Sequence, residues 1–228
     1  MPMPSLPPGS SLLTTGAAQP SNQRSRIKPD DHQRAIIECS DKVVVANAFA
    51  GSGKTTMAEF YAAARPTAQI LYVVFGKANQ LVAKARFGKN VDCRTGHSLA
   101  YEAIGHRFEG RNQIFLPPQD FARQLNMGDA RKAAVVLDIL NQWCVSSSAT
   151  ITADHLQEAS VKWGFDEREF VAYKALARLA WSKVVSPGSI ASVLPDFYLK
   201  MWALSRPKLS RYTHIILDEA QDTNPVMA

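Results

Sequence analysis

A glycine-rich stretch between an apolar run and a helical pattern constrains this chain more than any other feature. It reads Ala48-Phe-Ala-Gly-Ser-Gly-Lys54-Thr55 and follows the apolar run 43–46 and Asn47. Glycines at positions 51 and 53 let backbone N–H groups close around phosphate oxygens, and the start of the following helix adds partial positive charge. Such a lysine reaches the β- and γ-phosphates, and the threonine after it holds Mg²⁺. The alternative is a chance glycine-rich turn after a strand, and Ala48 stands where the pattern usually begins with glycine.

The stretch predicts a site for ATP and Mg²⁺, with Thr55 binding the metal ion. Lys54 is also predicted to act in catalysis. The residues expected to bind the nucleotide are Ala50, Gly51, Ser52, Gly53, Lys54, Thr55 and Thr56.

The surrounding sequence predicts an α/β fold with a parallel sheet. Val43–Asn47 is expected to be a buried strand, followed by a helix from about Lys54 to Ala64. Ile70–Phe75 is a second apolar run, and Val91–Thr95 is a shorter candidate strand. A strand, a loop of small residues, a helix and another strand form a βαβ unit, which favours a parallel sheet with helices on both faces.

Two adjacent acids provide the second chemical signal. The run Ile215-Ile-Leu-Asp218-Glu219-Ala-Gln221-Asp222 follows a predicted buried strand at His214–Leu217. A strand that delivers carboxylates at its C-terminal end supplies metal and water chemistry in a P-loop fold. Asp218 is predicted to bind Mg²⁺ through its water shell, and Glu219 to act as general base. Adjacent acids alone usually mark a solvated strand end, but their combination with the glycine-rich loop favours the functional reading.

Composition excludes several classes of protein. Hydrophobic residues make up 46% of the 228 residues and charged residues 20%, which excludes a wholly disordered, collagen-like or disulfide-dense chain. The three cysteines lack metal-ligand spacing, so we expect buried thiols and a reducing compartment. No apolar run is long enough to span a bilayer, and no structural metal or membrane partner is expected.

The basic charge is concentrated in one segment. The net charge is +6, and residues 77–94 contain five basic residues and one acid. This excess fits contact with nucleic-acid phosphates, although a solvated helix face explains it equally well on charge alone.

The chain is expected to have four parts. Residues 1–26 form a disordered tail rich in proline and serine, and a helix begins after a cap at Asp30 or Asp31. Residues 27–100 are the first part of the nucleotide-binding domain, 101–206 a helical insertion, and 207–228 the return strand with its acids. In the insertion, one predicted helical face carries Ala133, Val136, Leu137, Leu140 and Cys144. A second carries Phe170, Tyr173, Ala177, Ala180 and Val184, and Pro195 is placed to begin a further helix.

On these motifs the chain resembles the N-terminal part of a superfamily 1 DNA helicase of the UvrD/PcrA type, in the branch that contains the F-box DNA helicase. The resemblance covers roughly residues 27–227. It implies a P-loop NTPase (RecA-like) parallel sheet with an inserted helical subdomain similar to subdomain 1B. It also implies that Gln33, 21 residues before Lys54, reads adenine, and that Gln221 couples the γ-phosphate site to the DNA site.

The same resemblance implies contacts with single-stranded DNA. Phe75-Gly-Lys77-Ala, with Lys84 and Arg86 after it, is similar to motif Ia, although Gly76 replaces a usual asparagine. Thr95-Gly-His97-Ser98 resembles motif Ib, another contact with the phosphate backbone. The residues expected to bind DNA are therefore Phe75, Lys77, Lys84, Arg86, Thr95, His97 and Ser98.

The resemblance ends soon after Asp222. The later motifs, the arginine fingers and the second RecA-like domain of the family have no counterpart in these residues, so the sheet is expected to be incomplete at the C-terminus. A missing strand predicts an exposed sheet position and marginal solubility. An arginine finger contributes about 10³–10⁵ in rate, so the chain alone is expected to bind ATP weakly and to hydrolyse it poorly.

Two functional hypotheses follow. The first is the front part of an ATP-dependent 3′→5′ DNA helicase of recombination or repair, with the second RecA-like domain encoded downstream. The second is a stand-alone module that binds ATP and DNA without hydrolysis and partners or regulates a full helicase. A P-loop kinase or transporter ATPase fits Lys54 and Thr55 but not the helical insertion or Gln221. The expected location is cytoplasmic, on the nucleoid in a bacterium, or nuclear in a eukaryote.

Overall fold

A computed structural model of the chain describes residues 28–49 and 51–227. The predicted tail, residues 1–26, and the predicted nucleotide ligand Ala50 lie outside the described residues. The chain divides into two compact units, the first ending at Ala46 and the second beginning at Asn47. In the first unit, helix α1 (Asp31–Glu38) begins after Asp30, whose carboxylate accepts the Gln33 N–H at 2.8 Å. The predicted cap at Asp30 is confirmed.

The second unit contains, among the described residues, a parallel sheet of three strands in the order β2-β1-β3. The strands are β1 (Ile70–Val73), β2 (Val91–Arg94) and β3 (His214–Leu217). Ile70 is in register with both Val91 and His214. The predicted α/β fold with a parallel sheet is confirmed, and β1 is its buried central strand.

Two helices connect the glycine-rich loop and the first two strands. They are α2 (Lys54–Ala63), which precedes β1, and α3 (Lys77–Arg86), which joins β1 to β2. Ala58 of α2 and Ala83 of α3 pack with Tyr72, Val74 and Cys93 in the smaller of two hydrophobic clusters. These contacts fix both helices on the sheet.

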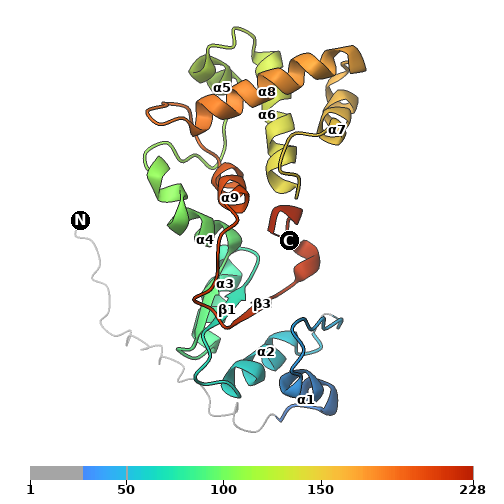
Figure 1. The fold of residues 1–228 in the computed structure, drawn as a ribbon, viewed down its shortest axis with the longest axis vertical. Helices are drawn as coiled ribbons and strands as arrows, with labels where there is room; N and C mark the ends of the chain where they lie inside the picture. The colour runs from blue at the N-terminus through green and yellow to red at the C-terminus, as the bar shows by residue number, and fades with distance from the viewer. Residues whose placement is uncertain (1–27, 50, 228) are drawn as a thin grey trace, which may run out of the picture. The chain divides into compact units, whose positions relative to one another are not determined.

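A run of helices lies between β2 and β3 in the sequence (Figure 1). They are α4 (Gly96–Ala103), α5 (Pro118–Leu125), α6 (Ala130–Val145), α7 (Ala153–Trp163), α8 (Phe170–Val185) and α9 (Pro195–Leu204). Helix α6 contacts α5, α7, α8 and α9. The apolar face predicted for α6 is buried, with Val136, Leu140 and Cys144 fully covered. The domain limits at residues 100 and 206 stay predictions.

The prediction of a strand at Val43–Asn47 is wrong. These residues form no strand, and the exposed fractions of Val43 and Val45 are 80% and 77%. A strand requires a neighbour for its backbone hydrogen bonds, and the sheet of the described residues pairs only β2, β1 and β3. A β-branched sequence favours an extended strand but does not supply a partner.

The strand predicted at His214–Leu217 forms, but it is not buried as expected. Leu71 and Val73 of β1 join the larger hydrophobic cluster with Leu99 of α4. Their register partners on β3, Ile215 and Leu217, are 55% and 41% exposed. Burial fails because β3 is one of the two edge strands of the sheet in the described residues, and the side chains that cover β1 do not extend over it.

None of the helices in residues 28–49 and 51–227 has the length and apolar character needed to cross a membrane.

Candidate functional site

The glycine-rich loop adopts the backbone geometry that its sequence predicts. Gly51 and Gly53 have φ values of 79° and 87°, in the left-handed region that glycine adopts without steric penalty. The Ser52 N–H donates to the Phe49 carbonyl at 3.2 Å, and Lys54 then begins α2. No side chain caps this helix start, so its first N–H groups stay available to an anion.

Lys54 meets the acids that follow β3. Its Nζ lies 3.2 Å from Glu219 Oε1 and donates to the Ala48 carbonyl at 3.3 Å. The two motifs are more than 160 residues apart in the sequence, and the fold joins them at the carboxyl edge of the sheet. The positive and negative groups predicted to act on the same phosphate are therefore in contact.

Glu219 has an unusual backbone. Its φ of 49° and ψ of 53° place it in the left-handed region, which it shares with Asn126 and Arg206 among the non-glycine residues described. For such a residue this conformation costs about 1–2 kcal/mol. The Gln221 amide donates to Glu219 Oε2 at 2.6 Å, and this bond together with Lys54 holds the pKa of Glu219 below its usual range. Glu219 is therefore ionised at neutral pH.

Asp218 is held from two directions. Its N–H donates to the Val73 carbonyl at 2.9 Å, and its Oδ2 accepts a hydrogen bond from the Tyr72 hydroxyl at 2.5 Å. Burial and the bond to Asp218 raise the pKa of the Tyr72 phenol, and the Thr55 side chain on its other side lowers it. Both residues predicted to hold Mg²⁺ therefore converge on one tyrosine.

The oxygen donors present fit Mg²⁺. The ion prefers hard oxygen ligands and is usually held by one or two carboxylates together with substrate phosphates. Asp218 supplies a carboxylate and Thr55 a hydroxyl, beside a loop suited to phosphate. Sequence reasoning missed Tyr72, and the available signal was a single polar group in the buried run Ile-Leu-Tyr-Val.

A cavity of about 550 Å³ lies at the same edge of the sheet. Five of the seven residues predicted to bind DNA line it: Phe75, Lys77, Thr95, His97 and Ser98. Residues from α9 and from the segment after the acids complete the wall, among them Tyr198 and Asn224. The structure thus brings the two segments predicted to be motifs Ia and Ib, together with residues of α9, to one cavity.

Several of these polar side chains already have protein partners. Thr95 Oγ1 accepts the Ser98 N–H and Ser98 Oγ accepts the Thr95 N–H, both at 3.0 Å, in a capping box at the start of α4. His97 Nε2 lies 2.8 Å from Asp196 Oδ1 of α9. Phe75, by contrast, exposes 58% of its surface.

The remaining basic residues do not act as one surface. Lys84 and Arg86 do not line the cavity. Arg86 Nε instead lies 2.5 Å from Glu59 Oε1, and Arg86 also donates to the Thr56 hydroxyl at 3.3 Å. Arg86 therefore joins α3 to α2, whereas Lys77 and Lys84 are exposed and form no ion pair within the described ranges.

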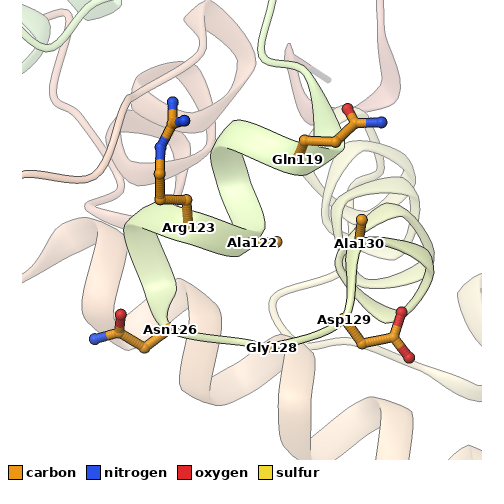
Figure 2. A pocket seen from close by; sticks show the side chains of 7 residues that line it. All are labelled: Gln119, Ala122, Arg123, Asn126, Gly128, Asp129 and Ala130. Carbon is orange, nitrogen blue, oxygen red and sulfur yellow. The ribbon is translucent and has the colours of Figure 1, made fainter.

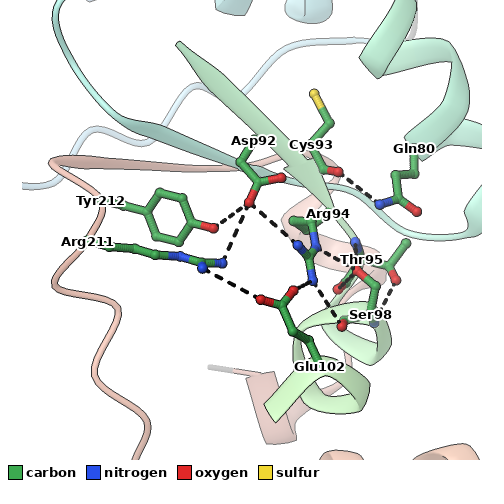
Figure 3. Close-up of polar contacts among 9 residues, drawn as sticks. All are labelled: Gln80, Asp92, Cys93, Arg94, Thr95, Ser98, Glu102, Arg211 and Tyr212. Carbon is green, nitrogen blue, oxygen red and sulfur yellow. Dashed lines mark hydrogen bonds and ion pairs between the residues drawn. The ribbon is translucent and has the colours of Figure 1, made fainter. Parts of the chain in front are cut away.

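Arg94 belongs to a second structural network (Figure 3). It forms ion pairs with Asp92 and Glu102, and Arg211 contacts the same two acids. The Tyr212 hydroxyl donates to Asp92 Oδ2 at 2.5 Å. The network connects β2, α4 and the segment that leads into β3, so Arg94 is used within the fold.

A second cavity, of about 530 Å³, lies beside α5 and the turn into α6 (Figure 2). Its polar lining includes Gln119, Arg123, Asn126 and Asp129. Arg123 pairs with Asp120 at 2.6 Å, and Asp129 caps α6. None of the predicted site residues lies here.

Gln33 lies in the first unit. Its Oε1 accepts the Asp30 N–H at 3.2 Å, in the capping box of α1. Its predicted contact with adenine stays a prediction.

Two curated proteins with similar sequences are DNA helicases, in agreement with the motifs. The chain is 32% identical over 227 aligned residues to F-box DNA helicase protein 1 of Schizosaccharomyces pombe, which covers 86% of the chain and 25% of the relative. It is 29% identical over 227 aligned residues to F-box DNA helicase 1 of Gallus gallus, covering 91% of the chain and 22% of that protein. The chain is similar to one segment of a DNA helicase.

The chain thus spans about a quarter of the length of these helicases. No protein-family model matches the chain, and no solved structure matches it.

Proposed function

We propose that this chain is the part of an ATP-dependent 3′→5′ DNA helicase that binds ATP and single-stranded DNA, acting in recombination or repair. The observation that carries the proposal is the contact between Lys54 Nζ and Glu219 Oε1 at 3.2 Å, beside a phosphate-type loop and Asp218. The direction of movement and the role in repair rest on the resemblance alone. The proposed location is the compartment that contains the DNA: the nucleus in a eukaryote or the nucleoid in a bacterium.

Each site residue has one role in the proposed reaction. When bound, ATP with Mg²⁺ supplies the γ-phosphoryl group and the charge that stabilises its transfer to water. The N–H groups at the start of α2 and the Lys54 ammonium bind phosphate oxygens. Thr55 and Asp218 hold the metal ion, and Glu219 accepts the proton of the attacking water.

The ion pair between Lys54 and Glu219 in the nucleotide-free protein affects the basicity of Glu219. Lys54 exchanges Glu219 for phosphate oxygens when the nucleotide enters. Lys54 is one of the two groups that lower the pKa of Glu219, so its departure moves that pKa upward toward the usual range. A base works best when its pKa approaches the operating pH, and Gln221 continues to orient the carboxylate through their 2.6 Å bond.

The cavity at the carboxyl edge is the proposed path of single-stranded DNA. Exposed Phe75 offers a face for base stacking, and Lys77 offers charge to a phosphate. Thr95, His97 and Ser98 complete the contact. Both sites lie at the carboxyl edge of the sheet, which provides a short route from the γ-phosphate to DNA through Gln221.

A single substitution tests the enzymatic part of the proposal. Glu219→Gln keeps the shape of the side chain but removes its basicity. In single-turnover assays with radiolabelled ATP and single-stranded DNA, the variant should hydrolyse ATP at least about 100-fold more slowly than wild type. Its affinity for ATP should be retained. Equal hydrolysis by both proteins contradicts the assignment of Glu219 as the base.

The same assay separates the two functional hypotheses. Wild-type chain that binds ATP and DNA but shows no turnover favours the stand-alone binding module. Slow turnover that depends on Glu219 favours the helicase segment, because a pure binding module has no chemical need for that carboxylate.

A further inference from the structure

Tyr72 occupies a position between the two predicted metal ligands. It lies on the central strand β1, is 1% exposed, and donates its hydroxyl proton to Asp218 Oδ2 at 2.5 Å. The Thr55 hydroxyl approaches the same phenol oxygen from α2. Three separate elements therefore meet at one hydroxyl group.

The core, and not the site, fixes the position of this ring. Tyr72 packs against Phe87, with ring centroids 4.4 Å apart, and shares the smaller hydrophobic cluster with Ala58, Ala83 and Ile216. A ring held on all sides has little rotamer freedom. The hydroxyl is therefore a fixed reference point for the groups that contact it.

The hydrogen-bond directions suit metal binding. Oδ2 of Asp218 is used by Tyr72, and Oδ1 has no hydrogen-bond partner in the part of the chain that the structure describes. A threonine hydroxyl that donates its proton to Tyr72 keeps its lone pairs free for a cation. The phenol thus leaves Oδ1 of Asp218 and the lone pairs of the Thr55 hydroxyl for a cation.

We propose that Tyr72 is a positioning residue for the Mg²⁺ site, orienting Asp218 and Thr55 toward the metal ion of bound Mg·ATP. The inference rests on the proposed function, because it requires that the loop bind a nucleotide with its metal. Outer partners that orient metal ligands typically contribute 10–100-fold to metal affinity. A purely structural hydrogen bond contributes nothing to metal dependence.

The chain contains a matched control for this bond. The Tyr212 hydroxyl donates to Asp92 Oδ2 at the same distance, 2.5 Å, in the network around Arg94. Tyr212→Phe therefore removes a tyrosine–aspartate bond of the same kind from a place without nucleotide-site residues. Tyr72→Phe removes only the hydroxyl and keeps the ring in the core.

The experiment measures the affinity of the full chain for a fluorescent non-hydrolysable ATP analogue, in saturating Mg²⁺ and in EDTA. In the wild type, Mg²⁺ should tighten binding. Tyr72→Phe should reduce that tightening by about tenfold and leave the affinity in EDTA unchanged. Tyr212→Phe should behave as the wild type in both media.

Two results overturn the inference alone: Tyr72→Phe keeps the wild-type effect of Mg²⁺, or it weakens binding equally in Mg²⁺ and EDTA. A wild-type chain that binds no analogue in either medium overturns the proposed function, and the inference with it. The two failures are therefore distinguishable.

A second measurement covers the case in which Tyr72→Phe does not fold. The six tyrosines of the chain can be labelled with 3-fluorotyrosine and followed by ¹⁹F NMR. One resonance should shift when Mg²⁺ is added to the analogue-bound protein, and the same resonance should shift in Asp218→Asn. If no resonance responds to both changes, Tyr72 does not report on the metal site and the inference is wrong.

Discussion

The Lys54 ammonium has two oxygen partners in this structure, the Ala48 carbonyl and the Glu219 carboxylate. Both belong to the residues that surround the expected phosphates. The strained backbone of Glu219 is maintained by the same set of contacts, because Gln221 and Lys54 bind its two carboxylate oxygens. Strain of this kind persists only where the surroundings hold it, and it concentrates at functional sites.

His155 is a second residue whose surroundings select one protonation state. It is 7% exposed, its Nδ1 accepts the Thr152 N–H at 3.0 Å, and its Nε2 lies 3.0 Å from Ser146 Oγ. Burial, followed by the charge of Lys200, lowers the pKa of His155. The folded protein therefore favours the neutral form of the His155 ring.

This environment predicts a pH-dependent stability. A lowered pKa in the folded state means that the contribution of His155 is complete above its unfolded pKa of about 6.5 and is lost as the pH falls through the folded value. The loss should be about 1 kcal/mol, the size of the hydrogen bond that protonation of Nδ1 removes. Urea unfolding at pH 7 and pH 5 measures it. His155→Gln should flatten this pH dependence, whereas exposed His106→Gln should not, and the same slope in all three proteins contradicts the account.

Residue types and spacing were sufficient to propose Lys54, Thr55, Asp218 and Glu219 as site residues, because loop chemistry and adjacent acids are local signals. Tyr72 could not be found in this way. Its partner Asp218 lies 146 residues further along the chain, and no local pattern marks a buried tyrosine as part of a distant site. The structural roles of Arg86 and Arg94 could not be predicted for the same reason. Their partners Glu59 and Glu102 lie on other elements of the fold.

At the scale of elements, helix α3 separates its basic residues onto different surfaces. Lys77 and Lys84 are exposed, whereas Arg86 is directed to Glu59 of α2. Lys77→Ala with Lys84→Ala should weaken binding to single-stranded DNA and reduce the slope of log affinity against log salt concentration by about 1.4, roughly 0.7 for each lost phosphate contact. Fluorescence anisotropy with a labelled oligonucleotide over a salt series measures both quantities.

Arg86→Ala is the matched comparison on the same helix. It should leave the salt slope unchanged and lower the melting temperature, because Glu59 loses its partner. A slope that falls in Arg86→Ala but not in the double lysine variant contradicts the division of α3 into two surfaces.

The strands show where sequence patterns were sufficient and where they were not. Strands were predicted at 70–75, 91–95 and 214–217, and they form at 70–73, 91–94 and 214–217. Residues 43–47 carry the same signal and form no strand. Strand formation depends on a partner that is distant in sequence, so the same local pattern has two outcomes.

The edge strand β3 should promote self-association. Ile215 is 55% exposed, and no described segment of the chain pairs with the free edge of β3. Ile215→Lys should reduce concentration-dependent light scattering of the chain, because a charge on an edge strand opposes pairing with another copy. Val161→Lys is the control, since it adds the same charge to α7 at a residue that is 79% exposed. An equal reduction in both variants attributes the effect to net charge and not to the edge of the sheet.

At the scale of the whole molecule, the parallel sheet explains why distant motifs meet. Parallel strands end at one edge, so the segments after β1, β2 and β3 carry motif Ia, motif Ib and the acids to the same place. The helical region between β2 and β3 adds Pro195, Tyr198 and Leu199 of α9 to the cavity formed there. A parallel sheet was predicted from the sequence, but the contribution of α9 to this cavity was not.

The measurement that tests the central proposal most directly is the binding of Mg·ATP to the full chain by isothermal titration calorimetry, in wild type and Lys54→Ala. We predict saturable binding at one site in the wild type. Lys54→Ala should lose this binding while keeping its thermal unfolding transition, because the ammonium is the proposed phosphate contact and its ion pair with Glu219 is partly exposed. A wild-type chain that binds no Mg·ATP, or a folded Lys54→Ala variant that binds it equally well, would contradict the proposal that this loop is a nucleotide site.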